Sequence, residues 1–196
     1  VVADDSADPE VVAADLLSQA EHDEDAYPLL LTTDEALARA TSAAVARQLA
    51  ALPETDGRGR PRRAVAVESV RRNGFALVVS SRDELARVAN TLAVEHVAVQ
   101  THDASELAGR ILRAGALFVG HYTPEAAGDY LAGPSHVLPT GGAARYGAPL
   151  GVYDFVSRSS VISYAEHALA AQADDITAFA RSEGLEAHAR AVEVRT

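Results

Sequence analysis

Histidine and acidic side chains are the groups in this 196-residue sequence that could bind a metal ion, since cysteine is absent and thiolate sites are excluded. His22 follows Gln19 by three residues, so both lie on one face near the end of an expected helix. Asp129 follows a glycine in a segment of small residues, and His188 lies near the end of the chain. His22, Asp129 and His188 would make a reasonable three-ligand zinc site with an open fourth position. Their wide spacing means that only the fold can bring them together.

Two further segments draw attention by their position. Glu95 and His96 end an expected helix at the mouth of an expected strand. We expect the ligand-binding loops to converge at the carboxyl end of a parallel sheet, where open α/β sheets bind their ligands. The segment 141–145, GGAAR, matches neither the dinucleotide fingerprint nor the P-loop spacing, which favours a tight turn over a phosphate loop.

Composition limits the classes of partner. The chain has 17 basic and 28 acidic residues and a net charge of −11, which argues against binding to a nucleic acid backbone. No apolar run reaches membrane-spanning length, so we expect no membrane partner and a cytoplasmic location. Apolar residues make up 48% of the chain and aromatic residues only 5%, as in α/β proteins packed through small aliphatic side chains.

The elements that must position these residues alternate between strand and helix. Strands are expected at 29–31, 75–79, 96–99, 116–119 and 161–164. Helices are expected from Asp8-Pro9-Glu10 to residue 20, from a capping box at 32–35 to just before Pro53, at 82–92 with a second capping box, at 105–113, from 123, at 166–181 and at 185–192. This order predicts a parallel, Rossmann-like α/β sheet flanked by helices, with a C-terminal helical tail. We expect one domain over 1–150 and a small segment over 151–196, and we interpret 54–63 as a solvated loop and not as a nucleic-acid contact.

Five segments have a pattern beyond that of their secondary structure: DLLSQAEHD (15–23), AVEHVAVQ (93–100), GHYTPEAAGDYLAGPSHVLPTGG (120–142), VYDFV (152–156) and EGLEAHARAV (183–192). Through these segments the sequence resembles the histidinol dehydrogenase family over essentially its whole length. Family members are much longer, and the resemblance begins partway along them. The chain is therefore expected to be partial and to lack the N-terminal half, which supplies most NAD-binding residues in the family.

The resemblance implies a function and a set of site residues. The reaction is the zinc-dependent oxidation of L-histidinol through L-histidinaldehyde to L-histidine, in two steps with NAD. The implied zinc ligands, which also contact substrate, are Gln19, His22, Asp129 and His188. The implied acid–base pair is Glu95 and His96, and the further substrate contacts are His96, His136 and Glu183. The family is a homodimer, so Glu183 and His188 are expected to act in trans from the C-terminal tail.

Alternatives remain open at this point. A His/Asp zinc site also suits a hydrolase, although no other feature favours one. The chain could instead be an inactive fragment or a zinc-bound dimerisation module without its cofactor site. Other divalent ions accept the same ligands as zinc.

Overall fold

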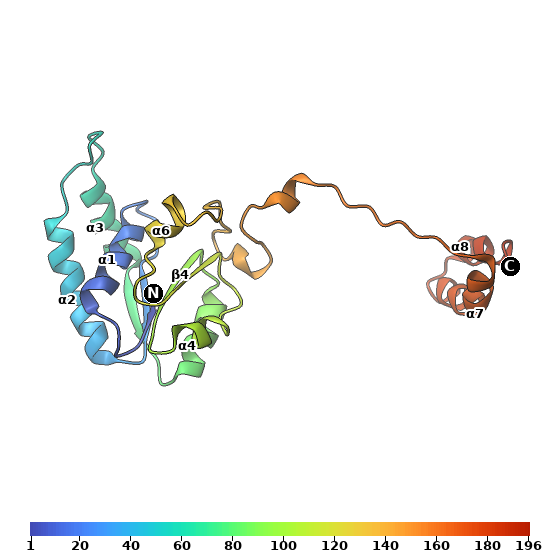
Figure 1. Ribbon diagram of the computed structural model, residues 1–196, viewed down its shortest axis with the longest axis horizontal. Coiled ribbons are helices and arrows are strands. Elements are labelled where there is room, and N and C mark those ends of the chain that lie inside the picture. The colour runs from blue at the N-terminus through green and yellow to red at the C-terminus, as the bar shows by residue number, and fades with distance from the viewer. The chain divides into compact units, whose positions relative to one another are not determined.

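The computed structural model describes all residues, Val1–Thr196, and divides them into two compact units, Val1–Asp154 and Phe155–Thr196. The first unit is built on a five-stranded sheet in the order β3-β2-β1-β4-β5, in which every pair is parallel (Figure 1). The strands are β1 (Val2–Ala3), β2 (Leu29–Thr32), β3 (Phe75–Val78), β4 (His96–Gln100) and β5 (Ala116–Val119). The predicted parallel α/β fold is confirmed.

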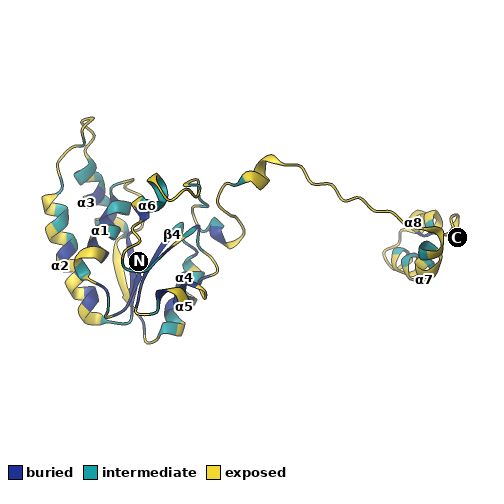
Figure 2. Ribbon diagram, viewed as in Figure 1, coloured by how far each residue is buried: buried dark blue, intermediate teal, exposed yellow.

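Helices cover the two faces of this sheet. They are α1 (Pro9–Ala20), α2 (Glu35–Ala51), α3 (Arg62–Asn73), α4 (Arg82–Leu92), α5 (Ala104–Ala108) and α6 (Glu125–Tyr130), with 3-10 turns η1 (Ala143–Arg145) and η2 (Val152–Phe155). Ala3 and Leu30 pack with buried side chains of α1 and α2. Their neighbours Val2 and Leu31 pack with α4 and α5, because successive side chains of a strand point to opposite faces. Figure 2 shows the inner sides of these helices buried together with β1, β2 and most of β4, whereas β3 at the edge of the sheet is exposed along its length.

Strand β1 was not predicted, although it lies at the centre of the sheet. Val2 pairs with Leu31 of β2 on one side and with Val99 of β4 on the other, and it is 2% exposed. Two residues are too short for a periodic pattern, and the acidic residues that follow suggested a polar terminus. The fold therefore assigns this strand through pairing and not through local propensity.

Helix starts follow local capping chemistry. Asp8 caps α1 by accepting a hydrogen bond from the backbone N–H of Glu10, as predicted. Ser81 likewise caps α4 by accepting from Glu84 N–H, while the Glu84 carboxylate accepts from Ser80. The prediction for α2 needs a correction.

Asp34, and not Thr32, caps α2. The Asp34 side chain accepts from Ala36 N–H at 2.8 Å. Thr32 is the last residue of β2, and its Oγ1 accepts from Asp34 N–H at 3.0 Å. The Thr32 hydroxyl therefore supports the turn that leads into the helix.

The predicted solvated loop is present over residues 54–61, which are mostly exposed, and only its last two residues belong to α3. Helix α3 itself was not predicted; it opens on arginines without a side-chain cap and continues to Asn73. Helix α5 ends at Ala108 and not at residue 113, because the Asn90 side-chain oxygen accepts the backbone N–H groups of Leu112 and Arg113. These bonds hold the chain in a non-helical path.

The second unit contains α7 (Glu166–Ser182) and α8 (Glu186–Glu193), joined through Gly184 at a φ of 77°. Its buried residues are few: Thr177 and Ala189, 7% and 0% exposed. The predicted strand at 161–164 is wrong, since these residues pair with no other strand and Val161 is 92% exposed. β-branched residues favour extended backbone, but a strand needs a partner. No helix in the structure is both long and apolar enough to cross a bilayer.

Candidate functional site

A cavity of about 490 Å³ lies at the amino end of the sheet. Its position follows from its lining, which includes the first residues of β2 and β4, Leu29 and His96, and the terminal residue Val1 beside β1. The polar and charged side chains that line it are Asp15, Gln19, Asp25, Tyr27, Glu95, His96, Glu125 and Thr140. The expectation that the site residues converge at the carboxyl end of the sheet was therefore wrong. Gln19 and Glu95 reach the opposite end because α1 and α4 run back to where the next strand begins.

Gln19 connects α1 with α6 at this cavity. It lies in the last turn of α1, and its amide Nε2 donates a hydrogen bond to the Glu125 carboxylate at the start of α6. Figure 1 shows α6 beside the upper end of α1. The amide oxygen of Gln19 makes no hydrogen bond, so it remains available to a ligand.

His96 is half-buried at the base of the cavity. Its ring stacks on Phe118 of β5, with ring centroids 5.8 Å apart and planes at 30°. Burial lowers the pKa of His96, the nearby charges of Glu95 and Asp129 oppose this, and His22 adds to it. The imidazole is therefore held towards its neutral form, in which one ring nitrogen accepts a proton.

Asp129 reaches the vicinity of His96 because α6 packs closely against β5. A Cβ on Gly128 would lie 2.6 Å from Cε1 of Phe118, so only glycine permits this approach. Phe118 also carries the stacked ring of His96. The small-residue turn before Asp129 thus sets its distance from His96.

His22 lies in an exposed loop after α1, and α3 holds this loop in place. Nη1 of Arg62 donates to the carbonyl oxygens of Glu21 at 3.1 Å and His22 at 3.4 Å. Further along α3, Ser69 and Asn73 donate to the carbonyl oxygen of Ala26. The helix that the sequence did not predict is therefore the element that positions one of the predicted ligands.

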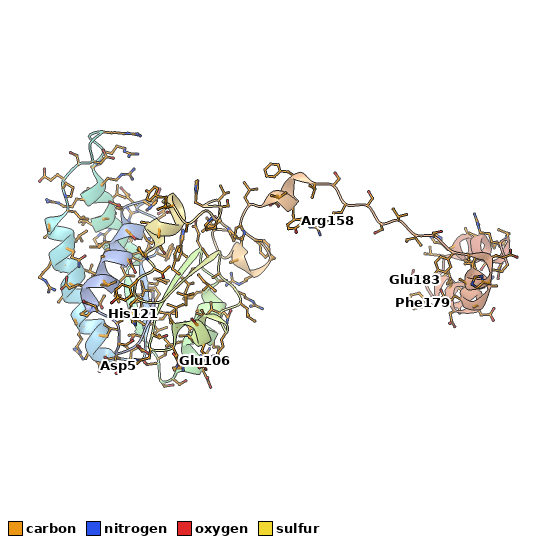
Figure 3. All side chains as sticks on the ribbon, in the orientation of Figure 1. Asp5, Glu106, His121, Arg158, Phe179 and Glu183 are labelled. Carbon is orange, nitrogen blue, oxygen red and sulfur yellow. The ribbon has the colours of Figure 1, made fainter.

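Five predicted site residues do not line this cavity. Two of them, His22 and Asp129, still lie near enough to His96 to influence its pKa. His136 is exposed in the loop between α6 and η1 and does not line the cavity. Glu183 and His188 belong to the second unit and are exposed; Figure 3 labels Glu183 beside Phe179 at the end of α7.

Glu125 is one of the cavity residues that sequence reasoning missed, and it is the most buried of the charged side chains that line the cavity. It is 6% exposed, and burial raises its pKa to about 8; the Val1 amine opposes the rise, and the carboxylates of Asp15, Asp129 and Glu95 add to it. The signal in the sequence was its spacing, since Glu125 precedes Asp129 by four residues and shares its face of α6.

At the carboxyl end of the sheet a second polar cluster has a structural explanation. Ligand atoms of Asp4, Asp5 and His102 lie within 4.8 Å of one another, and Figure 3 shows Asp5 at the lower edge of the unit. The Asp4 carboxylate, however, accepts from Ser6 N–H and from His102 N–H, both at 3.0 Å. Burial alone would raise the pKa of Asp4, but the hydrogen bond from the Ser6 hydroxyl, together with the two from backbone N–H groups, lowers it below its ordinary value. Asp4 thus ties the loops after β1 and β4 together.

The class that the fold and the site define is an α/β protein with a parallel sheet flanked by helices and with carboxamide, carboxylate and imidazole groups around one cavity. Comparison with known proteins narrows this class. The family model described as histidinol dehydrogenase matches residues 1–196, and the chain belongs to that family.

Named relatives agree with this assignment. The chain is 50% identical to the histidinol dehydrogenase of Lactiplantibacillus plantarum and 49% identical to that of Bacillus subtilis, each over 195 residues that cover 100% of this chain and 44% of the relative. It is also similar to the crystal structure of histidinol dehydrogenase from Elizabethkingia anophelis, with a TM-score of 0.85, 34% identity, and coverage of 99% of this chain and 43% of that one. The chain thus spans less than half the length of the curated relatives that it matches.

Proposed function

We propose that this chain is the zinc- and substrate-binding part of a histidinol dehydrogenase, which oxidises L-histidinol through L-histidinaldehyde to L-histidine with two NAD. The observation that carries the proposal is the convergence of Gln19, Glu95 and His96 on one cavity, with Asp129 and His22 near His96. Family membership supports the choice of substrate. NAD would accept the two hydrides, and its contacts are proposed to lie mainly outside this chain, which has no dinucleotide fingerprint.

The donor set fits zinc. An amide oxygen, an imidazole and a carboxylate are ligands of a borderline cation, and the free Gln19 oxygen faces no competing hydrogen-bond donor. Gln19, His22 and Asp129 would hold the ion, together with a His188 supplied by the other subunit of the proposed homodimer. A bound zinc ion is redox-silent and would supply orientation and polarisation of the substrate's polar groups.

His96 is proposed as the base of the first oxidation. As hydride leaves the carbinol carbon, the hydroxyl proton must pass to a nearby acceptor, and a neutral imidazole is suited to receive it. Burial lowers the pKa of the ring, which favours its neutral form, and the ring stacks on Phe118.

Glu95 is proposed to act in the second oxidation. The aldehyde must first gain water, and the Glu95 carboxylate lines the same cavity as His96 and would take the proton of that water. The resulting hydrate carries the hydrogen that leaves as the second hydride.

The second unit is proposed to contribute Glu183 and His188 to the site of the partner in a homodimer, and His136 is proposed as a further substrate contact. A pair of helices that buries only Thr177 and Ala189, while Phe179 is 72% exposed, lacks a core sufficient for stability alone. This supports a role against another surface. A cytoplasmic location is proposed with the biosynthetic role.

Calorimetric titration of L-histidinol into the purified chain, with zinc loaded and then stripped, tests the proposal. We expect heat of binding only with zinc. Absence of binding in a zinc-loaded sample with native circular dichroism would contradict the claim that this chain holds the substrate.

Sharing between subunits has its own test in the full-length enzyme. A His188→Ala subunit mixed with a His22→Ala subunit should regain activity, because one of the two mixed sites keeps all four ligands. Lack of recovery in a verified mixed dimer would contradict action in trans.

A further inference from the structure

Glu125 is a buried carboxylate in direct contact with a proposed metal ligand, and no step of the proposed reaction uses it. It is 6% exposed, stands at the first position of α6 and lines the cavity with Gln19 and His96. Its Oε2 accepts the hydrogen bond that Gln19 Nε2 donates. The Gln19 side chain makes no other hydrogen bond, so Glu125 is the single group that fixes its amide.

The chemistry of a carboxamide explains why such a bond matters. The two ends of an amide have similar shapes, but only the oxygen is a metal ligand and only the nitrogen donates hydrogen bonds. In its ionised form, which a divalent cation bound nearby favours, the Glu125 carboxylate accepts from the NH₂ end and offers nothing to the oxygen end. The bond to Glu125 therefore selects the orientation in which the Gln19 oxygen is directed to a ligand.

The same bond also joins two elements. Glu125 lies four residues before Asp129, on the same face of α6, and Gln19 lies three residues before His22 at the end of α1. A hydrogen bond between Gln19 and Glu125 therefore fixes the end of α1 relative to α6. It thereby fixes the proposed ligands Gln19 and His22 relative to Asp129. Groups that orient metal ligands typically change metal affinity by about 10- to 100-fold when removed.

We propose that Glu125 is a positioning residue that sets the orientation of the Gln19 amide and its place beside α6, so that the amide oxygen is presented to the metal ion. The proposal rests on the zinc site of the proposed function. It assigns to Glu125 no contact with metal or substrate.

A double-mutant cycle between Gln19 and Glu125 tests this in the 196-residue chain, with Zn²⁺ affinity measured by competition with a chromophoric chelator. Glu125→Ala should weaken Zn²⁺ binding by about 10- to 100-fold when Gln19 is present. In the Gln19→Ala background the same substitution should change the affinity by less than about 2-fold, since nothing remains to be oriented. An equal loss in both backgrounds, or no loss in either, would overturn the proposal.

Two further variants keep the test decisive. Glu125→Gln is nearly isosteric and replaces Glu125→Ala if that variant does not fold. Its amide would bond to either end of the Gln19 amide. We therefore expect a smaller loss of Zn²⁺ affinity, which again depends on Gln19. Asp15→Asn is the matched control, because Asp15 lines the same cavity but accepts from Gln100 at 2.6 Å. Its effect on Zn²⁺ affinity should be the same in both Gln19 backgrounds.

A second readout reports on the ligand itself. The visible spectrum of bound Co²⁺ should change on Glu125→Ala as it does on Gln19→Ala, whereas a Glu125→Ala spectrum identical to that of the wild type would count against the proposal. If the wild-type chain binds neither Zn²⁺ nor Co²⁺, the proposed function fails. If it binds both and Glu125 has no effect, only this inference fails.

Discussion

Replacing Glu125 by glutamine should make the metal-free protein more stable at high pH. Burial raises the pKa of Glu125 from the ordinary value of 4.5 to about 8. Below pH 4.5 the carboxyl is protonated in both the folded and the unfolded state. Between 4.5 and 8 the unfolded chain ionises while the folded protein retains its proton, so the stability that protonation contributes is lost as pH rises through this window.

The size of the effect follows from the two pKa values. A difference of about 3.5, at about 1.4 kcal/mol for each pKa unit, corresponds to a loss of up to about 5 kcal/mol at high pH. Between pH 6 and pH 9 the free energy of unfolding falls by about 3 kcal/mol through this group. The lower pH of 6 lies above the isoelectric point of about 5.0, at which the protein would carry no net charge. Glutamine has almost the same shape and never ionises, so Glu125→Gln should avoid this loss.

Urea unfolding at pH 6 and pH 9, with chelator present to keep divalent ions from the site, measures the difference. The free energy of unfolding of Glu125→Gln should gain about 3 kcal/mol on the wild type between the two pH values. Glu54→Gln is the matched control, because the Glu54 side chain is 82% exposed and should follow the wild type. Parallel curves for wild type and Glu125→Gln would refute the conclusion that the burial of Glu125 outweighs its attraction to the Val1 amine.

Three further predictions concern the residues around the cavity. In the full-length enzyme, His96→Ala should lower kcat by about 10²- to 10⁴-fold without weakening histidinol binding. Stopped-flow kinetics measures the rate and calorimetry the affinity, and a nearly normal rate would remove His96 from the mechanism. Gly128→Val should weaken Zn²⁺ binding and lower the melting temperature, because a side chain there meets an aromatic ring at 2.6 Å, and an unchanged melting curve would contradict this packing. Arg62→Ala should weaken Zn²⁺ binding several-fold, because it removes the hydrogen bonds that hold the His22 loop. The control Arg63→Ala removes a hydrogen bond to the carbonyl oxygen of Leu52 and should not weaken Zn²⁺ binding. Equal effects of the two substitutions would show that α3 does not position the loop.

The cavity residues differ in how far the sequence alone could find them. Glu95, His96 and Gln19 lie in segments with a recognisable family pattern, and all three line the cavity. Glu125 lies in the same long segment as Asp129 but escaped notice, because acidic residues at helix starts are common and usually exposed. Its importance comes from burial beside Gln19, which no local pattern encodes.

The sequence by itself determined the alternation of strand and helix and most element boundaries, because capping residues such as Asp8 and Ser81 and the period of apolar residues act over a few neighbours. Only the tertiary structure decided that β1 stands at the centre of the sheet, that α3 exists and holds the His22 loop, and that the cavity lies at the amino end of the strands. These features depend on pairing, packing and burial between segments far apart in the chain. Such interactions form only when the whole sheet and its helices assemble, and they are also what gives Glu125 its raised pKa.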